Sequence, residues 1–264
     1  MNSSLRHALS QHLLALADDE LILGHRDSQW CGMAPLLEED IAFANLALDE
    51  IGHALVWYTL LADLAGEDHY IYPDRLVYFR QIADFRNVQL VELPNGDWAF
   101  SMLRQYLFDT YETVYLAAAV GSAHQPLAEA AAKIRLEEIY HYRHTSAWVR
   151  RLGLGSVESQ RRLQAALDKI WPYTGQLFAL SPGDEFLVSA GYLPPSTILS
   201  STWKDQVVPF LLDCGLQVPV ESGDEDTQTG RFHPPLSRER HTPHLKVLLR
   251  ELQSVPRLEP QAVW

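Results

Sequence analysis

Cysteine is nearly absent from this chain: two residues, Cys31 and Cys214, stand among 264. They are far apart in the sequence and form neither a Cys-x-x-Cys pair nor a zinc-binding spacing, which argues against a disulfide scaffold or a zinc fold. We expect both to be reduced thiols in a cytoplasmic protein.

Long apolar runs and an excess of positive charge are also missing. No segment approaches the roughly 20 apolar residues that cross a bilayer, and the polar start does not resemble a signal peptide. The chain has 21 Lys and Arg against 34 Asp and Glu, a formal net charge of −13. Such a charge repels nucleic acids and anionic membranes. We therefore expect neither as a partner, although a local basic patch would still admit an anionic small molecule.

Strand alternation is absent as well, and helical periodicity dominates. The length and the hydrophobic fraction of 47% fit a single globular domain over residues 1–264. The long helices are predicted at about 5–26, 36–65, 97–121 and 125–152. Shorter or later helices are predicted near 74–84, 156–179, 196–214 and 239–253. The stretch 218–243, rich in Gly, Pro and charge, is expected to be a mobile surface loop or an interface segment.

The connections between the four long helices indicate how they pack. A short link joins the third to the fourth, so these two should be antiparallel neighbours, and about thirty residues separate the second from the third. A crossover of that length closes ferritin-like bundles. The sequence therefore predicts an all-α, ferritin-like four-helix bundle with additional C-terminal helices.

Two Glu-x-x-His pairs, Glu50–His53 and Glu138–His141, lie in the second and fourth long helices. Residues three apart share a helix face, so each pair presents an oxygen and an imidazole nitrogen to one metal ion. The motif alone is a weak signal. Its position is more informative, because both pairs interrupt apolar seams that should face the bundle interior.

Each of the other two long helices carries a carboxylate in its seam. Glu20 stands in a leucine seam of the first helix, and the third helix offers Asp109 or Glu112, of which we prefer Glu112. One Glu from each of two helices and Glu-x-x-His from each of the others is the ligand plan of a di-iron or di-manganese bundle. The predicted metal ligands are Glu20, Glu50, His53, Glu112, Glu138 and His141. No catalytic residue is assigned.

Other interpretations of these residues remain open. Asp49 and Glu137 precede the glutamates of the two motifs, and we expect them to orient ligands or form rim salt bridges. Glu137, His141 and His144 form a competing set, but their seam is more polar, which favours a solvated face. In the absence of metal, the histidines would be core residues and the carboxylates would pair with Arg or Lys.

Several segments resemble the C subunits of ring-1,2-phenylacetyl-CoA epoxidase, which belong to the ferritin-like superfamily. These segments occur in the same order along nearly the whole chain: 29–45, 91–96, 104–106, 152–153, 169–171 and 241–245. The Trp-Cys-Gly and Pro-Asn-Gly parts are fairly specific. The resemblance implies a subunit of a multicomponent monooxygenase that forms a ring epoxide from an aryl-CoA in aerobic phenylacetate breakdown.

The resemblance also implies partners: a related A subunit with the di-iron centre and the CoA thioester, a small B subunit, and a flavin and iron–sulfur reductase. The C subunit of this family is regarded as a scaffold that has lost most metal ligands. Of the six predicted ligands only His141 belongs to that pattern. The chain therefore either carries its own di-iron centre (Fe or Mn) or is a metal-free scaffold, in a homo- or hetero-oligomer.

Overall fold

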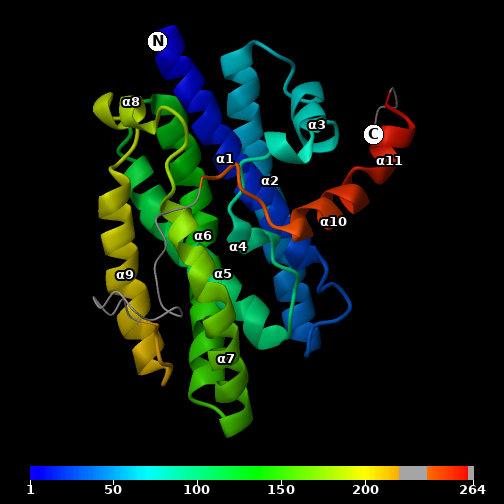
Figure 1. The fold of residues 1–264 in the computed structure, drawn as a ribbon, viewed down its shortest axis with the longest axis vertical. Coiled ribbons are helices and arrows are strands. Elements are labelled where there is room, and N and C mark those ends of the chain that lie inside the picture. The colour runs from blue at the N-terminus through cyan, green and yellow to red at the C-terminus, as the bar shows by residue number, and fades with distance from the viewer. Residues whose placement is uncertain (220–236, 261–264) are drawn as a thin grey trace.

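The computed structural model describes residues 1–219 and 237–260, and all regular structure in these ranges is helical. Four long helices form the bundle: α1 (Ser3–Ser28), α2 (Leu37–Ala65), α5 (Trp98–Ala119) and α6 (Gln125–Gly153). Helices α1 and α2 pack along each other, as do α5 and α6 (Figure 1). The prediction of an all-α, ferritin-like bundle is confirmed.

Capping residues determine where the long helices begin and end. The side chain of Asn2 accepts a hydrogen bond from Leu5 N at 2.8 Å at the start of α1, and Asp97 caps α5 through Phe100 N at 3.0 Å. Helix α2 ends at Ala65 and is capped by Gly66, whose positive φ of 72° is left-handed and disfavours residues with a Cβ.

Shorter helices surround the bundle unevenly. The helices that directly follow α6, from α7 to α9, cover α5 and part of α1. The helices of the crossover between α2 and α5, and the C-terminal helices α10 and α11, lie at the other side of the molecule (Figure 1). The shorter helices are α3 (Ile71–Tyr78), η1 (Ile82–Asp84), α4 (Gln89–Glu92), α7 (Val157–Ile170), η2 (Trp171–Phe178), α8 (Asp184–Ser189), α9 (Ser196–Asp213), α10 (Pro243–Leu252) and α11 (Ser254–Leu258). Within the described ranges, no helix combines the length and apolar character needed to cross a membrane.

Three predicted helices differ from those observed. The helix predicted over 156–179 ends at Ile170 and continues as the 3-10 helix η2, because Pro172 has no N–H to donate and fixes its own φ. The one predicted over 74–84 is α3 followed by η1. The helix predicted over 239–253 begins at Pro243, because Thr242 caps its first turn. Helices α4, α8 and α11 were not predicted.

The predicted mobile segment 218–243 is described only at its two ends, and residues 220–236 lie outside the described ranges. The second end contacts the bundle through two side chains. Arg238 Nη1 lies 2.7 Å from Asp19 Oδ2 of α1, and His241 Nδ1 lies 2.7 Å from Glu92 Oε1 of α4. Both side chains thus pair with buried carboxylates of the bundle, and the expectation of a mobile loop or an interface segment stays a prediction.

Candidate metal centre

All six predicted ligands point into the bundle, and none of their residues is more than 3% exposed. Helix α1 contributes Glu20, α2 contributes Glu50 and His53, α5 contributes Glu112, and α6 contributes Glu138 and His141. The apolar seams bring them there, because the same helix faces carry the leucines, tryptophans and alanines of the core.

Two groups of donor atoms are close enough to hold a metal ion. One consists of Glu20, Glu50 and His53 and the other of Glu50, Glu138 and His141, and within each group the ligand atoms lie within 4.8 Å of one another. Glu50 belongs to both groups. The Nδ1 atom of His53 is 3.7 Å from Glu20 Oε2, and that of His141 is 2.9 Å from Glu138 Oε1. This is the arrangement of two adjacent ion sites that share a carboxylate.

Several of these donor atoms are buried without a hydrogen-bond partner. They include both carboxylate oxygens of Glu20, one oxygen each of Glu50, Glu112 and Glu138, and Nδ1 of His53. A buried polar atom without a partner costs about 1–3 kcal/mol. Other buried atoms of the chain also lack a partner, but these lie on the converging ligands, where a bound cation would satisfy them. A set of four carboxylates and two imidazoles suits iron or manganese.

The outer nitrogen of each histidine bonds to a carboxylate on the opposite helix. His53 Nε2 lies 2.7 Å from Glu137 Oε2, and His141 Nε2 lies 3.3 Å from Asp49 Oδ2. The side chains of Asp49 and Glu137 are 40% and 46% exposed, so both sit at the bundle surface. A hydrogen bond to Nε2 directs Nδ1 towards the interior, which is how proteins orient imidazole ligands.

The two carboxylates of α5 have different surroundings. Both oxygens of Asp109 accept hydrogen bonds, from Gln105 Nε2 at 2.8 Å and from Thr145 Oγ1 at 2.6 Å. Glu112 keeps an unpaired oxygen and lies outside both three-residue groups, next to the carboxyl groups of Glu20 and Glu138. Asp109 is thus held as a hydrogen-bond acceptor, whereas Glu112 keeps one carboxylate oxygen without a hydrogen-bond partner.

The competing set of Glu137, His141 and His144 is not assembled. Glu137 contacts the histidine of the other helix, as described above, and His144 Nε2 lies 3.1 Å from Glu39 Oε2. Trp148 Nε1 donates to the same Glu39 oxygen at 2.7 Å. His144 therefore contacts Glu39 between α2 and α6, outside the group of six.

Burial and the mutual charges of the six ligands set the electrostatics of the group. Burial and the neighbouring carboxylates raise the pKa of Glu20 and Glu112 well above the usual range. Burial would also raise the pKa of Glu138, but His141 and His53 outweigh it and hold that pKa at about 2. Burial lowers the pKa of His141, yet Glu138 and other acceptors outweigh it and raise the value to about 12. Without metal, the group holds its charge as a Glu138–imidazolium cluster with protonated carboxyls beside it.

A glycine sets the spacing between α1 and α2 beside Glu50. A Cβ on Gly24 would lie 3.0 Å from Ala47 O, Glu50 Cβ and Ile51 Cγ1. The two helices therefore approach so closely at this level that a side chain would force its neighbours, Glu50 among them, to shift. This requirement of Gly24 is not visible in the seam pattern.

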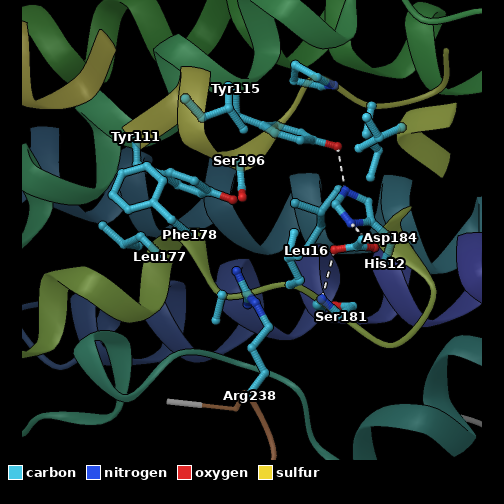
Figure 2. Close-up of a pocket in the computed structure, with 17 residues that line it drawn as sticks. His12, Leu16, Tyr111, Tyr115, Leu177, Phe178, Ser181, Asp184, Ser196 and Arg238 are labelled. Carbon is cyan, nitrogen blue, oxygen red and sulfur yellow. Dashed lines mark hydrogen bonds and ion pairs between the residues drawn. The ribbon is translucent and has the colours of Figure 1, made fainter. Parts of the chain in front are cut away.

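A second cluster of polar side chains lies in a cavity of about 40 Å³ between α1, α5, η2, α8 and α9 (Figure 2). His12 Nδ1 is 3.3 Å from Asp184 Oδ1, and His12 Nε2 is 2.9 Å from the hydroxyl of Tyr115. Arg238 projects into the same cavity from the C-terminal segment (Figure 2). Sequence analysis missed this cluster, because its members come from distant segments and share no local spacing.

Comparison with known proteins identifies the class to which this bundle belongs. Residues 1–264 match the model of the family PaaA_PaaC, described as "Phenylacetic acid catabolic protein". The chain belongs to this family. It is 34% identical over 256 residues to the C subunit of 1,2-phenylacetyl-CoA epoxidase from Escherichia coli (strain K12), covering 97% of this chain and 99% of that protein. The resemblance stated from the sequence is confirmed.

Proposed function

We propose that the chain is a subunit of a multicomponent oxygenase that epoxidises phenylacetyl-CoA or a similar aryl-CoA, and that it holds its own carboxylate-bridged dinuclear centre. The likeness to an epoxidase C subunit along the full length of the chain supports the first part. The burial of six donor residues at one point of the bundle carries the second.

The donor groups suggest which residues would hold each ion. Glu20 and His53 would be terminal ligands of one ion, with Glu50 as a bridge. Glu138 would be the second bridge, and Glu112 and His141 would complete the other ion. When bound, two iron or manganese ions in such a site supply the electrons and open positions that dioxygen needs.

The surrounding residues fix the ligands and keep water away from them. Gln105 Nε2 donates to Glu50 Oε1 at 2.7 Å and also to Asp109, so the amide holds the shared carboxylate in place. The carboxylates of Asp49 and Glu137 accept the outer N–H of the histidines. A rigid set of ligands in a dry interior is what oxygen chemistry requires.

The same geometry supports a second candidate, a metal-free scaffold subunit. Glu138 Oε1 lies 2.9 Å from His141 Nδ1 and 3.4 Å from His53 Nδ1, so one carboxylate pairs with both imidazoles. With Glu20 and Glu112 protonated, the interior charge is partly compensated without an ion. In this case the chain would pair with a related, catalytic A subunit.

Metal analysis separates the two candidates. The protein should be purified without oxygen, reconstituted with ferrous iron or manganese, freed of excess metal and measured by mass spectrometry. About two ions per chain support the dinuclear centre, and their loss in Glu138→Ala with retention in Glu129→Ala, an exposed position of the same helix, assigns them to this site. A metal content near zero in the wild type supports the scaffold.

The proposed partners are the related A subunit, a small B subunit and a flavin and iron–sulfur reductase, with an aryl-CoA as substrate. The word "subunit" in the name of the relative supports an assembly. Co-expression with an A-subunit homologue and purification through a tag on one chain tests it. Recovery of this chain alone would contradict the assembly.

A further inference from the structure

Three polar side chains from distant parts of the chain meet in a row at the cavity of Figure 2. The hydroxyl of Tyr115 on α5 lies 2.9 Å from Nε2 of His12 on α1, and His12 Nδ1 lies 3.3 Å from Oδ1 of Asp184 on α8. Tyr115 is 2% exposed, and the side chains of His12 and Asp184 are 12% and 6% exposed. A phenol, a base and a carboxylate are therefore in contact and largely shielded from water.

The contacts of Asp184 assign the protons of this row. Ser181 N donates to Oδ2 of Asp184 at 2.8 Å, whereas Oδ1 of the same carboxyl group has only the His12 contact (Figure 2). A carboxylate accepts hydrogen bonds and does not donate them, so we assign the imidazole proton to Nδ1. The other ring nitrogen, Nε2, then presents a lone pair to the hydroxyl of Tyr115. His12 is thereby held as an acceptor for the phenolic proton.

The surroundings of Tyr115 restrict how its hydroxyl can lose that proton. Burial raises the pKa of Tyr115 well above its usual value, so the phenol does not ionise by itself. Oxidation changes this, because a phenol that has lost an electron is a strong acid. The proton must then leave at once, since an unpaired charge in the interior is costly. His12 is a base already in contact with the hydroxyl, and Asp184 stabilises the imidazolium that forms.

Two other buried tyrosines lack this arrangement. The hydroxyl of Tyr58 donates to Asp18 at 2.5 Å, but the same carboxylate is paired with Arg80. A proton that arrived at Asp18 would therefore break an ion pair. The hydroxyl of Tyr106, on the same helix as Tyr115, is buried without a hydrogen-bond partner. Compared with these two, Tyr115 has a neutral acceptor that can take up a proton.

We propose that Tyr115 is a redox-active residue, which gives one electron to a one-electron oxidant while its hydroxyl proton passes to Nε2 of His12. The products are a neutral phenoxyl radical, an imidazolium beside Asp184, and an oxidant reduced by one electron. Return of one electron and of the same proton restores the phenol, so the residue is not consumed.

The oxidant within the chain would be an oxidised iron or manganese ion held by Glu112. Tyr115 follows Glu112 by one turn of α5, and both side chains are buried. This assignment of the oxidant rests on the proposed function. The exchange of an electron and a proton at Tyr115 does not, because any sufficiently strong one-electron oxidant can drive it.

The test uses an external oxidant on metal-free protein, so its failure would leave the proposed dinuclear centre untouched. Glu185 is an exposed residue of α8 next to Asp184. In a Cys31→Ser background, which removes the exposed native thiol, Glu185→Cys is labelled with a ruthenium polypyridyl complex. A flash with a sacrificial cobalt(III) acceptor then generates ruthenium(III). Electron paramagnetic resonance after rapid freezing should show a tyrosyl radical. Its coupling to the proton received by His12 should disappear in heavy water.

Substitutions assign the radical to its residue. Tyr115→Phe should abolish the signal, whereas Tyr106→Phe, a change at an equally buried tyrosine of the same helix, should leave it unchanged. His12→Gln keeps a hydrogen-bond acceptor but removes the base, so it should slow formation of the radical about 100-fold or more. Asp184→Asn should slow it less, because the base remains.

The folded state of each variant is checked by circular dichroism, which should show the helix content of the wild type. If Tyr115→Phe does not fold, the rate of radical formation in His12→Gln decides. A wild type without a tyrosyl signal, a signal that persists in Tyr115→Phe, or equal rates in the wild type and His12→Gln would each overturn the proposal.

Discussion

The Nε2 atom of His53 on α2 lies 2.7 Å from Oε2 of Glu137 on α6, one residue before Glu138. The reciprocal contact joins His141 to Asp49, one residue before Glu50. Each Glu-x-x-His helix therefore supplies the acceptor that orients the histidine of the other. The two halves of the candidate centre depend on each other, and neither hairpin could build it alone.

Removal of one of these acceptors should weaken metal binding without removing a ligand. Glu137→Gln or Asp49→Asn should lower the affinity for ferrous or manganous ions about 10–100-fold, because the amide is a weaker acceptor for the imidazole N–H. Titration of the metal under anaerobic conditions, monitored by calorimetry, measures the change in affinity. Glu129→Gln, on the exposed side of α6, should leave the affinity unchanged. Equal metal affinity in all three variants would show that these two hydrogen bonds do not orient the histidine ligands.

The metal-free protein should lose stability as the pH rises from about 5 to 9. Burial raises the folded-state pKa of Glu20 and Glu112. Their contribution to stability is therefore fully present below the pKa of the unfolded chain, and it is lost as the pH rises through the folded-state pKa. His141 acts in the same direction between its unfolded pKa and about 12. Within the candidate metal centre, Glu138, with a pKa of about 2, loses its contribution towards acid instead.

Urea unfolding in EDTA at several pH values measures this slope. Saturating metal should flatten or reverse it, because the ligands bind as anions and the metal affinity rises with pH. A free energy of unfolding that increases with pH in EDTA would contradict the assigned protonation states.

The long helices and the six converging residues could be predicted because their signal is local. A polar residue that interrupts an apolar seam, such as Glu20 or Glu138, shows its direction within one or two helical turns. The partners of those residues could not be predicted this way. Gln105 and Thr145 have no distinctive spacing, and their hydrogen bonds depend on how α5 meets α2 and α6. Whether metal occupies the site stays a prediction.

The ion pair of Asp27 and Arg104 offers a test of the bundle itself. Both side chains are fully buried, with Arg104 Nη2 3.0 Å from Asp27 Oδ1. Arg104→Met should lower the free energy of unfolding by about 3–5 kcal/mol, because it leaves a buried carboxylate without a cation. Combining it with Asp27→Leu should recover most of the loss. The exposed pair Glu158–Arg161 is the control, since Arg161→Met should change stability little.

The approach of α1 to α2 can be tested with two glycines. Gly24→Ala should destabilise the protein by about 1–3 kcal/mol by overpacking, and it should also reduce metal binding because it displaces Glu50. Gly52→Ala adds a Cβ that meets no atom within 4 Å, so it should stabilise the helix by about 0.5–1 kcal/mol. Thermal and urea unfolding compare the two. Similar effects in both variants would show that the close approach at Gly24 has no special role.

Three aspartates of α1 pair with arginines from much later in the chain: Asp18 with Arg80, Asp27 with Arg104 and Asp19 with Arg238. The last of these cations lies more than two hundred residues after its aspartate in the chain. Because a buried aspartate without its cation is costly, the position of α1 in the bundle depends on segments that lie at very different distances along the chain.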